Sequence, residues 1–328
     1  MKQPTNTIPS AAATNGYDYR MTPYLMALLR GRPADDPLSL QFLPQEQELT
    51  ALAYESADPI GDGPFTPVAG VVHRHPDRIL LKVAHSCPVY CRFCFRREMI
   101  GSKGAPLQGE QLDAAIAYVR AHPKIWEVIL TGGDPLSLSG RRLRDILSNL
   151  ASIEHVSVLR IHSRVPIVAP LDDSYMSALE QPLPVYLAVH VNHADEITDA
   201  VVAALRRLSA AGVVLLSQTV LLRGVNDNED VLEALFRRLV GLKVRPYYLH
   251  HPDLAPGTSH FRVPIEVGQR LMRCLRRTVS GLCLPTYVLD IPGGFGKVPI
   301  GPMYVGARNA SGCRQIQDTA GAWHSYPE

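Results

Sequence analysis

Two hydrophobic periods alternate along the chain, and this alternation constrains the fold more than any other feature. Short apolar runs rich in β-branched residues recur between segments whose apolar residues repeat at i, i+3, i+4 and i+7. Such runs occupy residues 79–84, 127–131, 156–161, 185–191, 213–219 and 244–249, and a shorter run, 286–290, ends at Asp290. The helix-period segments between them are 109–122, 141–152, 196–212, 228–241 and 265–281. Strands that alternate with helices in this way form a parallel sheet with right-handed crossovers.

Six strand–helix units are fewer than the eight that close a complete barrel. The sequence therefore predicts an α/β fold built as a partial (β/α)6 barrel, with an open doubly wound sheet as the alternative. Residues 1–65 are polar, rich in proline and broken by turns, apart from an amphipathic stretch that begins at Thr22 and Pro23. We expect an N-terminal helical extension at 1–65, the barrel at 66–290 and a short C-terminal segment at 291–328.

Composition excludes several classes of function. The chain has 46% hydrophobic and 20% charged residues and a formal net charge of +2, which is too small for a protein whose main partner is nucleic acid or an anionic membrane. We expect a small-molecule partner instead. The N-terminus has no apolar run of a secretory signal, and the chain has no uninterrupted run of about 18 apolar residues. These features predict a cytoplasmic protein, in which clustered cysteines are ligands or redox thiols and not disulfides.

Polar residues follow the strands at the edge where parallel α/β proteins bind their ligands. Any one of them alone is more typical of a turn or a helix cap. Their succession along one edge predicts a single polar cavity. After a cysteine-rich loop at the first strand, these residues are Asp134 (which follows Gly132 and Gly133), Ser163, Arg164, His190, Asn192, Gln218 and Asp253.

Three cysteines, Cys87, Cys91 and Cys94, lie in the stretch "HSCPVYCRFCFRRE" at the spacing Cys-x3-Cys-x2-Cys. Three thiolates can hold three irons of a 4Fe–4S cluster, whereas an electron-carrier cluster is normally closed by a fourth. The other cysteines are scattered along the chain. The fourth iron is then open to a ligand that is not protein. A zinc site completed by a histidine such as His85, or a redox thiol pair, is the alternative.

A glycine-rich turn precedes Lys297 in the stretch "VLDIPGGFGKVPIGP". The stretch is not a phosphate-binding P-loop, because Ile291 replaces the first glycine of that motif and Val298 replaces its hydroxyl residue. A lysine on such a loop at the mouth of a cavity suits Schiff-base formation with pyridoxal phosphate, since small neighbours admit a bulky cofactor. A solvated surface lysine is the plain alternative.

The cysteine loop resembles that of the radical SAM superfamily, including an aromatic residue, here Phe93, before the last cysteine. The resemblance implies that the three cysteines bind a 4Fe–4S cluster. It also implies that the open iron binds S-adenosylmethionine, whose one-electron cleavage yields a 5′-deoxyadenosyl radical. The Gly-Gly-Asp element at 132–134 matches the element that binds the methionine ammonium, and His190 would lie close to the same cofactor.

Together with the lysine loop, these motifs resemble the lysine 2,3-aminomutase family over about three quarters of the chain, from Asp58 to Pro302. The matching stretches include HRHPDR, CRFCFRR, LTGGDPL, HVNHADEIT, QTVLLRGVND and RPYYLHHPDLAPGTSHFR. The resemblance implies a radical SAM barrel and an isomerase that converts L-lysine to β-lysine. The implied cofactors are the 4Fe–4S cluster, S-adenosylmethionine and pyridoxal 5′-phosphate.

The resemblance also assigns roles around pyridoxal phosphate. Lys297 carries the cofactor, and Arg74 and Gln218 lie near its phosphate. The adenosyl radical removes a hydrogen from the β-carbon of the substrate, the nitrogen moves from C2 to C3, and S-adenosylmethionine is regenerated. The glycine run of longer members is interrupted here by Phe295, which we expect to narrow the cofactor pocket.

By the same resemblance, Arg96 binds the substrate carboxylate as a fork, and Asp253 and Asp290 hold the side-chain ammonium of lysine. Singly, each aspartate is more typical of a turn or a strand end. Two carboxylates would repel glutamate, and the longer planar head of arginine needs a differently spaced pair. An aminomutase for glutamate or arginine is the alternative among enzymes. A non-catalytic iron–sulfur or zinc sensor or scaffold is the alternative from a different class.

The expected partners are an amino acid substrate and an electron donor such as flavodoxin or ferredoxin, and a homo-oligomer is left open. Of the Cys-rich, zinc-binding tail of longer members only Cys313 remains, so no zinc is expected. The short chain resembles the branch of the family that makes β-lysine for attachment to elongation factor P.

Overall fold

A nine-stranded sheet forms the centre of the computed structural model, which describes residues 19–100, 106–169 and 171–328. Its strands neighbour one another in chain order, from β1 to β9. Seven of them are parallel: β2 (Arg78–Ala84), β3 (Glu127–Gly132), β4 (Val158–Ser163), β5 (Val185–His190), β6 (Val214–Val220), β7 (Arg245–His250) and β8 (Thr286–Ile291). At the two ends of this series, β1 (Val71–His75) and β9 (Gly296–Pro299) pair antiparallel with β2 and β8.

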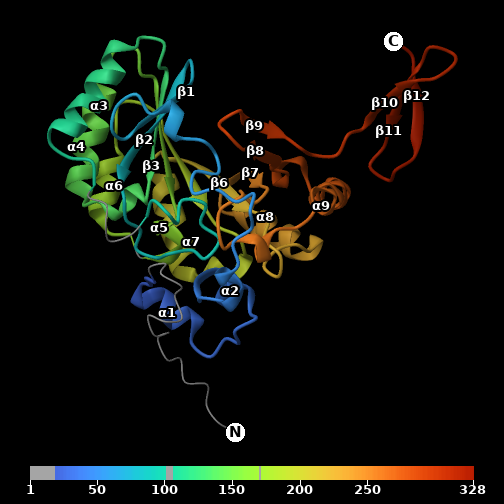
Figure 1. Ribbon diagram of the computed structural model, residues 1–328, viewed down its shortest axis with the longest axis horizontal. Coiled ribbons are helices and arrows are strands. Elements are labelled where there is room, and N and C mark those ends of the chain that lie inside the picture. Colours follow the sequence, from blue (N-terminus) through green and yellow to red (C-terminus); the bar gives the residue numbers. More distant parts are fainter. Residues whose placement is uncertain (1–18, 101–105, 170) are drawn as a thin grey trace, which may run out of the picture.

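Helical connections link each parallel strand to the next. The helices are α3 (Glu110–Ala121), α4 (Gly140–Ala151), α5 (Val165–Val168), α6 (Asp173–Leu179), α7 (Asp199–Ala210), α8 (Glu229–Gly241) and α9 (Ile265–Thr278). Because the strand order follows the chain order, right-handed crossovers place these helices on one side of the sheet, and the other side curls inward (Figure 1). The partial (β/α)6 barrel is thereby confirmed. A doubly wound sheet would reverse its strand order at a switch point.

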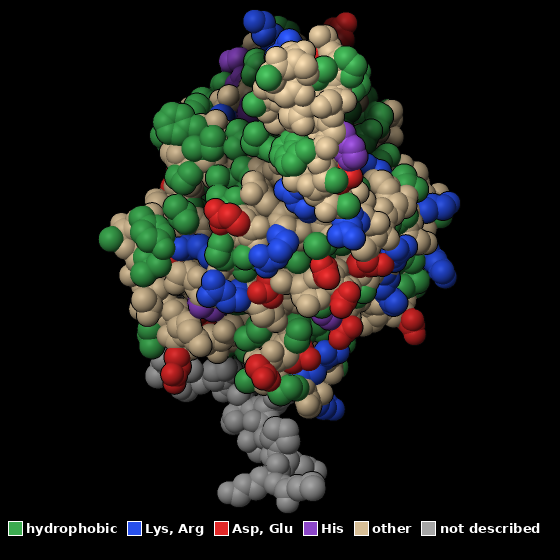
Figure 2. All heavy atoms as spheres, turned by 90° about the vertical axis from the view of Figure 1, so that its right-hand side faces the viewer, with side chains coloured by type: hydrophobic (Ala, Val, Ile, Leu, Met, Phe, Trp, Pro, Cys, Tyr) green, Lys and Arg blue, Asp and Glu red, His purple; other side chains and the backbone are tan. Residues whose placement is uncertain are grey.

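Beyond the barrel, the chain ends in a small sheet that the sequence pattern did not predict. Strands β10 (Val305–Arg308), β11 (Arg314–Gln317) and β12 (Trp323–Tyr326) are antiparallel and project away from the barrel (Figure 1). Each is too short to show a period of two over several residues. On the face shown in Figure 2, acidic and basic side chains are interspersed, as the small net charge suggests. In the described residues, no helix has both the length and the apolar character needed to cross a lipid bilayer.

The N-terminal extension packs directly on the barrel. Helix α1 (Pro23–Leu29) begins as predicted, with Pro23 in its first turn and the Thr22 hydroxyl accepting a 3.1 Å hydrogen bond from the Leu25 amide. Helix α2 (Pro37–Phe42) and the 3-10 turns Glu46–Leu49 and Gly63–Phe65 follow. Apolar residues of α1 and α2 belong to the same buried core as the barrel; they are Leu25, Leu29, Leu38 and Phe42.

A buried ion cluster attaches this extension to the cysteine loop. The fully buried Glu48 carboxylate accepts hydrogen bonds from Arg92 Nε at 2.9 Å and from Arg92 Nη2 and Arg97 Nη2 at 2.5 Å. Burial alone would raise the pKa of this carboxyl, but the hydrogen bonds and charges of the two arginines lower it. The Arg92 amide also donates to the Gln41 carbonyl at 2.9 Å. The extension therefore determines where the cysteine loop lies.

We expect Glu48→Gln to reduce the free energy of unfolding by about 3 to 5 kcal/mol, because two buried guanidinium groups lose their counter-charge. Denaturant titration of the folded protein measures this change. Glu46→Gln, at an exposed position in the same 3-10 turn, is the matched control and should have no measurable effect. Equal stability of the two variants would contradict the structural role of Glu48.

Candidate active site

The inner side of the barrel encloses a cavity of about 670 Å³, a size typical of small-molecule sites. Of the residues predicted to line one polar cavity, Asn192 does not: its side chain is fully buried, donates to Gln41 Oε1 at 3.0 Å and accepts from the Val220 amide at 2.9 Å. The other predicted residues are far apart in the sequence and line this cavity. They are Arg74, Cys87, Cys91, Cys94, Arg96, Gly132, Gly133, Asp134, Ser163, Arg164, His190, Gln218, Asp253, Asp290 and Lys297. Most of them lie at or beyond the carboxyl ends of parallel strands, which is where this architecture places ligands.

The cysteine loop contributes three free thiols to the cavity wall. Burial raises the pKa of Cys91 to about 11, and burial also raises the pKa values of Cys87 and Cys94. A cationic iron cluster stabilises the thiolate form of its ligands, so the three cysteines could serve as cluster ligands despite these raised pKa values. His85, the histidine of the zinc alternative, is not among the residues that line the cavity. In the described parts of the chain, no three His, Cys, Asp or Glu side chains are arranged to hold a single metal ion.

The Gly-Gly-Asp element packs backbone to backbone against the cysteine loop. The Gly133 amide donates to the Ala84 carbonyl at 2.6 Å, and the Asp134 amide donates to the Ser86 carbonyl at 3.0 Å. A Cβ atom on Gly133 would lie 2.3 Å from the Ser86 oxygen, a distance that no side chain can accept. Glycine is thus required for the close approach of the two loops.

Asp134 links the ends of β3 and β4, a role that the sequence did not predict. Its Oδ1 accepts hydrogen bonds from the Leu136 amide at 3.0 Å and the Ser163 hydroxyl at 2.7 Å. Its Oδ2 accepts from the amides of Arg164 at 2.7 Å and Val165 at 3.1 Å. Burial nevertheless raises the pKa of this carboxyl.

Neutral imidazoles form part of the inner wall. His190 lies against Phe93, with ring centroids 5.4 Å apart, and its Nε2 is buried without a hydrogen-bond partner. Gln218 Nε2 lies 3.4 Å from His162 Nε2. Burial lowers the pKa values of His162, His190 and His250 well below the usual range, so all three are uncharged near neutral pH. A buried nitrogen without a partner beside a cavity is what a ligand site requires.

His162 and His250 were missed in the sequence, although a signal was present. Arg160 and His162 occupy alternate positions of β4, and Tyr248 and His250 occupy alternate positions of β7. Side chains two residues apart share one face of a strand. Polar residues at this spacing inside an apolar run therefore mark the wall of a cavity.

The lysine loop places Lys297 opposite Asp290, its register partner across β8 and β9. The two side chains form an ion pair, and the Lys297 Nζ lies 3.3 Å from His250 Nδ1. Burial, and next the charge of Asp290, raise the pKa of Asp253 to about 7. Two carboxylates thus act on the same primary ammonium.

Phe295 does not narrow the pocket, so that expectation was wrong. Its side chain is 80% exposed in the turn between β8 and β9. Gly293 and Gly294 adopt φ values of +86° and +87°, and this left-handed backbone directs the following residue outward. A Cβ atom on Gly61 would lie 2.5 Å from the Gly294 nitrogen, so the N-terminal extension crosses directly over this turn.

Arginines provide the cationic part of the cavity. The Arg74 Nη2 donates to the Ile60 and Gly61 carbonyls at 2.8 and 3.1 Å, and Arg160 pairs with Glu127 at 3.1 Å. The Nε atoms of Arg74 and Arg160 and the Nη1 atom of Arg96 are buried without hydrogen-bond partners. Unpartnered guanidinium donors suit anionic groups such as a phosphate or a carboxylate. The residues present therefore fit pyridoxal phosphate and an amino acid.

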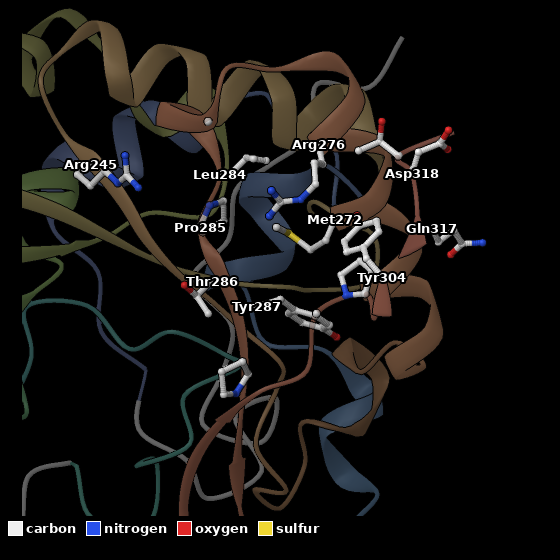
Figure 3. A pocket seen from close by; sticks show the side chains of 15 residues that line it. Arg245, Met272, Arg276, Leu284, Pro285, Thr286, Tyr287, Tyr304, Gln317 and Asp318 are labelled. Atoms are coloured by element: carbon white, nitrogen blue, oxygen red, sulfur yellow. The ribbon is translucent and has the colours of Figure 1, made fainter. Parts of the chain in front are cut away.

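A second cavity, of about 810 Å³, lies between the start of β7 and β8, helix α9 and the C-terminal segment. Figure 3 shows Met272, Arg276 and Tyr304 around it and Arg245 at its far end. Although it is larger, it contains none of the predicted site residues and no cluster of groups for catalysis. The barrel cavity is therefore the candidate active site.

Comparisons with known proteins agree with this assignment. The family model of the radical SAM superfamily matches residues 81–235. L-lysine 2,3-aminomutase of Clostridium subterminale is 41% identical over 87% of this chain and 69% of its own length. The enzyme of the same name from Acetoanaerobium sticklandii is 41% identical over 88% and 70%. Glutamate 2,3-aminomutase of Clostridioides difficile is 34% identical over 88% and 69%. The chain belongs to the lysine 2,3-aminomutase family of the radical SAM superfamily.

Proposed function

We propose that this protein is an isomerase that converts L-lysine to β-lysine, with a 4Fe–4S cluster, S-adenosylmethionine and pyridoxal phosphate as its cofactors. The observation that carries the choice of lysine is a pair of neighbouring carboxylates beside a primary ammonium: Asp290 pairs with Lys297, and the charges of both residues act on Asp253. A buried ammonium needs paired anions, since an unpaired buried charge costs about 3 to 5 kcal/mol. The same cavity holds Arg96, whose free donor suits a carboxylate.

The cofactors supply an organic radical and a conjugated ring that delocalises it, and the chain supplies positions and charges. Cys87, Cys91 and Cys94 would hold the cluster, and the 132–134 element and His190 would lie beside S-adenosylmethionine. Lys297 would carry pyridoxal phosphate, with Arg74 and Gln218 near its phosphate. Gly61 of the extension lies directly against Gly294, in the turn before Lys297, and so fixes the position of the lysine loop.

Charge separates lysine from the other amino acids that the family uses. Once Lys297 carries the cofactor, its ammonium no longer neutralises Asp290, and the side-chain ammonium of the substrate can take its place. Glutamate would bring a third carboxylate to Asp253 and Asp290 and be repelled. The greater identity to lysine enzymes than to a glutamate enzyme, 41% against 34%, favours the same choice.

We further propose a division into the N-terminal extension 1–65, the barrel 66–290 and the C-terminal segment 291–328. A flavodoxin or ferredoxin would reduce the cluster, and a reducing cytoplasm would protect the thiols. We also propose that the chain forms a homo-oligomer and that its β-lysine is used to modify elongation factor P. Incubation of the product with elongation factor P and its attaching enzyme, followed by mass analysis of the factor, would test this pathway.

The proposed function is tested by anaerobic incubation of the reconstituted enzyme with both organic cofactors, a reductant and L-lysine. We expect β-lysine as the product, and no product from glutamate or arginine. Cys94→Ala should lose both iron and the cleavage of S-adenosylmethionine, because a cluster ligand is missing. Preferred turnover of glutamate would overturn the substrate, and an active iron-free enzyme would overturn the chemistry.

Lys297→Ala should abolish covalent attachment of pyridoxal phosphate, because only a primary amine forms a Schiff base. Borohydride reduction followed by peptide mapping locates the attachment in the unaltered protein. Lys243→Ala, at an exposed position between α8 and β7, is the control and should retain the label on Lys297. A label on any other lysine would refute the assignment.

The pH dependence of lysine turnover should report Asp253. Because its pKa is raised to about 7, this carboxyl is protonated and uncharged at lower pH and cannot bind an ammonium. We expect kcat/KM for lysine to rise about tenfold per pH unit up to about pH 7 and then to level off.

Asp253→Asn should remove this acidic limb and reduce kcat/KM at pH 8 by about tenfold to a hundredfold. Asp145→Asn, at an exposed position of α4, is the matched control and should preserve the profile. An unchanged profile in the Asp253 variant would exclude the assigned role.

A further inference from the structure

One buried carboxylate, that of Asp62, contacts three cationic side chains beside the active-site cavity. Its Oδ1 lies 3.3 Å from Arg74 Nη2, and its Oδ2 lies 3.3 Å from Arg96 Nη2 and 3.6 Å from Lys82 Nζ. The Asp62 side chain is 4% exposed and that of Lys82 is 9% exposed. Ionised groups this far from water need partners of opposite charge, because burial of each is costly.

The position of Asp62 is itself fixed by the extension. The Asp62 amide donates to Asp58 Oδ1 at 2.8 Å, and the Gly63 amide donates to Asp58 Oδ2 at 2.8 Å. Asp58 thus closes a turn that presents the Asp62 carboxylate to the barrel. Lys82 reaches the same carboxylate from β2, where it shares the inward strand face with Leu80, a residue of the cavity wall.

The Arg96 guanidinium contacts a carboxylate through one terminal nitrogen, and its other terminal nitrogen has no hydrogen-bond partner. Its Nη2 contacts Asp62, its guanidinium lies 5.0 Å from the centroid of the Phe95 ring, and its Nη1 is buried without a hydrogen-bond partner. Arg96 lines the cavity. A guanidinium whose orientation is set by a carboxylate on one edge presents its other edge in a constant direction.

We propose that Asp62 and Lys82 are positioning residues for the substrate carboxylate. Asp62 orients Arg96, so that its free edge faces the carboxylate, and Lys82 maintains a positive field there by sharing Asp62 Oδ2 with Arg96. This inference rests on the proposed function, in which Arg96 binds the carboxylate of lysine. The charges support it: Arg74, Lys82 and Arg96 outnumber the carboxylates of Asp62 and Asp58, which leaves a local excess of positive charge for an anionic ligand.

The alternative is that Lys82 only neutralises Asp62. The two roles differ in what they predict for a ligand without a carboxylate. L-lysinamide has both amino groups of lysine but an amide in place of the carboxylate. A positioning role affects lysine and spares lysinamide, whereas a purely structural role affects both ligands equally.

The test measures the dissociation constants of L-lysine and L-lysinamide for the holoenzyme without reductant, through the visible absorbance of the cofactor, so that no turnover occurs. Lys82→Met should weaken lysine binding about tenfold and leave lysinamide binding within about twofold, since one cation of the field is removed. Lys82→Arg should bind lysine as the unaltered enzyme does. Lys124→Met, at an exposed position, is the control and should change neither constant.

The double variant Asp62→Asn/Lys82→Met separates orientation from charge, because it retains the local net charge while removing the contact that orients Arg96. We expect it to bind lysine at least about tenfold more weakly and to be more stable to heat than Asp62→Asn alone. Equal changes for lysine and lysinamide, in either Lys82→Met or the double variant, would overturn the inference. If the unaltered enzyme forms β-lysine, such a result leaves the proposed function intact; absence of β-lysine would refute that function instead.

Discussion

The Glu48 carboxylate, buried between Arg92 and Arg97, is the interaction on which the rest of the active site depends. Both arginines belong to the cysteine loop, which has no regular secondary structure to hold its thiols in place. A buried carboxylate satisfied by two guanidinium groups is directional, and removal of one partner leaves a charge that cannot reach water. Arg97 also donates to the Gly257 carbonyl at 3.0 Å. One ion cluster therefore joins the extension, the cysteine loop and the loop after β7.

Further carboxylates of the extension repeat this arrangement around the cavity. Glu55 pairs with Arg262 and accepts a 3.3 Å hydrogen bond from the Gly257 amide, in the loop that carries Asp253. Asp62, also in the extension, pairs with Arg74 and Arg96, two arginines that line the cavity. Since a partial barrel leaves its edge strands unjoined, these contacts replace the strand pairing that a closed barrel would use to fix its loops. The extension is thus part of the active site, although no extension residue was predicted there.

Sequence patterns could predict those parts of the fold and of the site that are determined by local periodicity and by short motifs. The parallel strands, α1 with its Thr22 cap, and the polar residues at the strand ends such as Asp134 and His190 belong to this class, because the alternation of strands and helices brings every strand end to one edge. The roles of Arg74 and Arg96 came from the family resemblance instead. Glu48 and Asp62 could not be found in this way, since their partners lie more than ten residues away and an acidic residue in a turn has no distinctive spacing. The direction of Phe295 depends on the left-handed φ of two preceding glycines, which composition does not determine.

The distribution of charge inside the cavity explains why one fold can serve a dipolar substrate. Arg74 and Arg96 form a cationic region of the wall, and Lys82 contacts the Asp62 carboxylate that holds both of them. Asp253 and Asp290 form an anionic region, and the imidazoles in the wall are neutral because burial lowers their pKa values. An amino acid with a carboxylate and a distant ammonium matches both regions at once. Charged groups inside a protein interact strongly when the surrounding dielectric is low, so a ligand with the opposite charge pattern would be repelled at both regions. Selectivity for the amino acid therefore follows from two buried sets of charge, each held in place by chain segments outside the parallel strands.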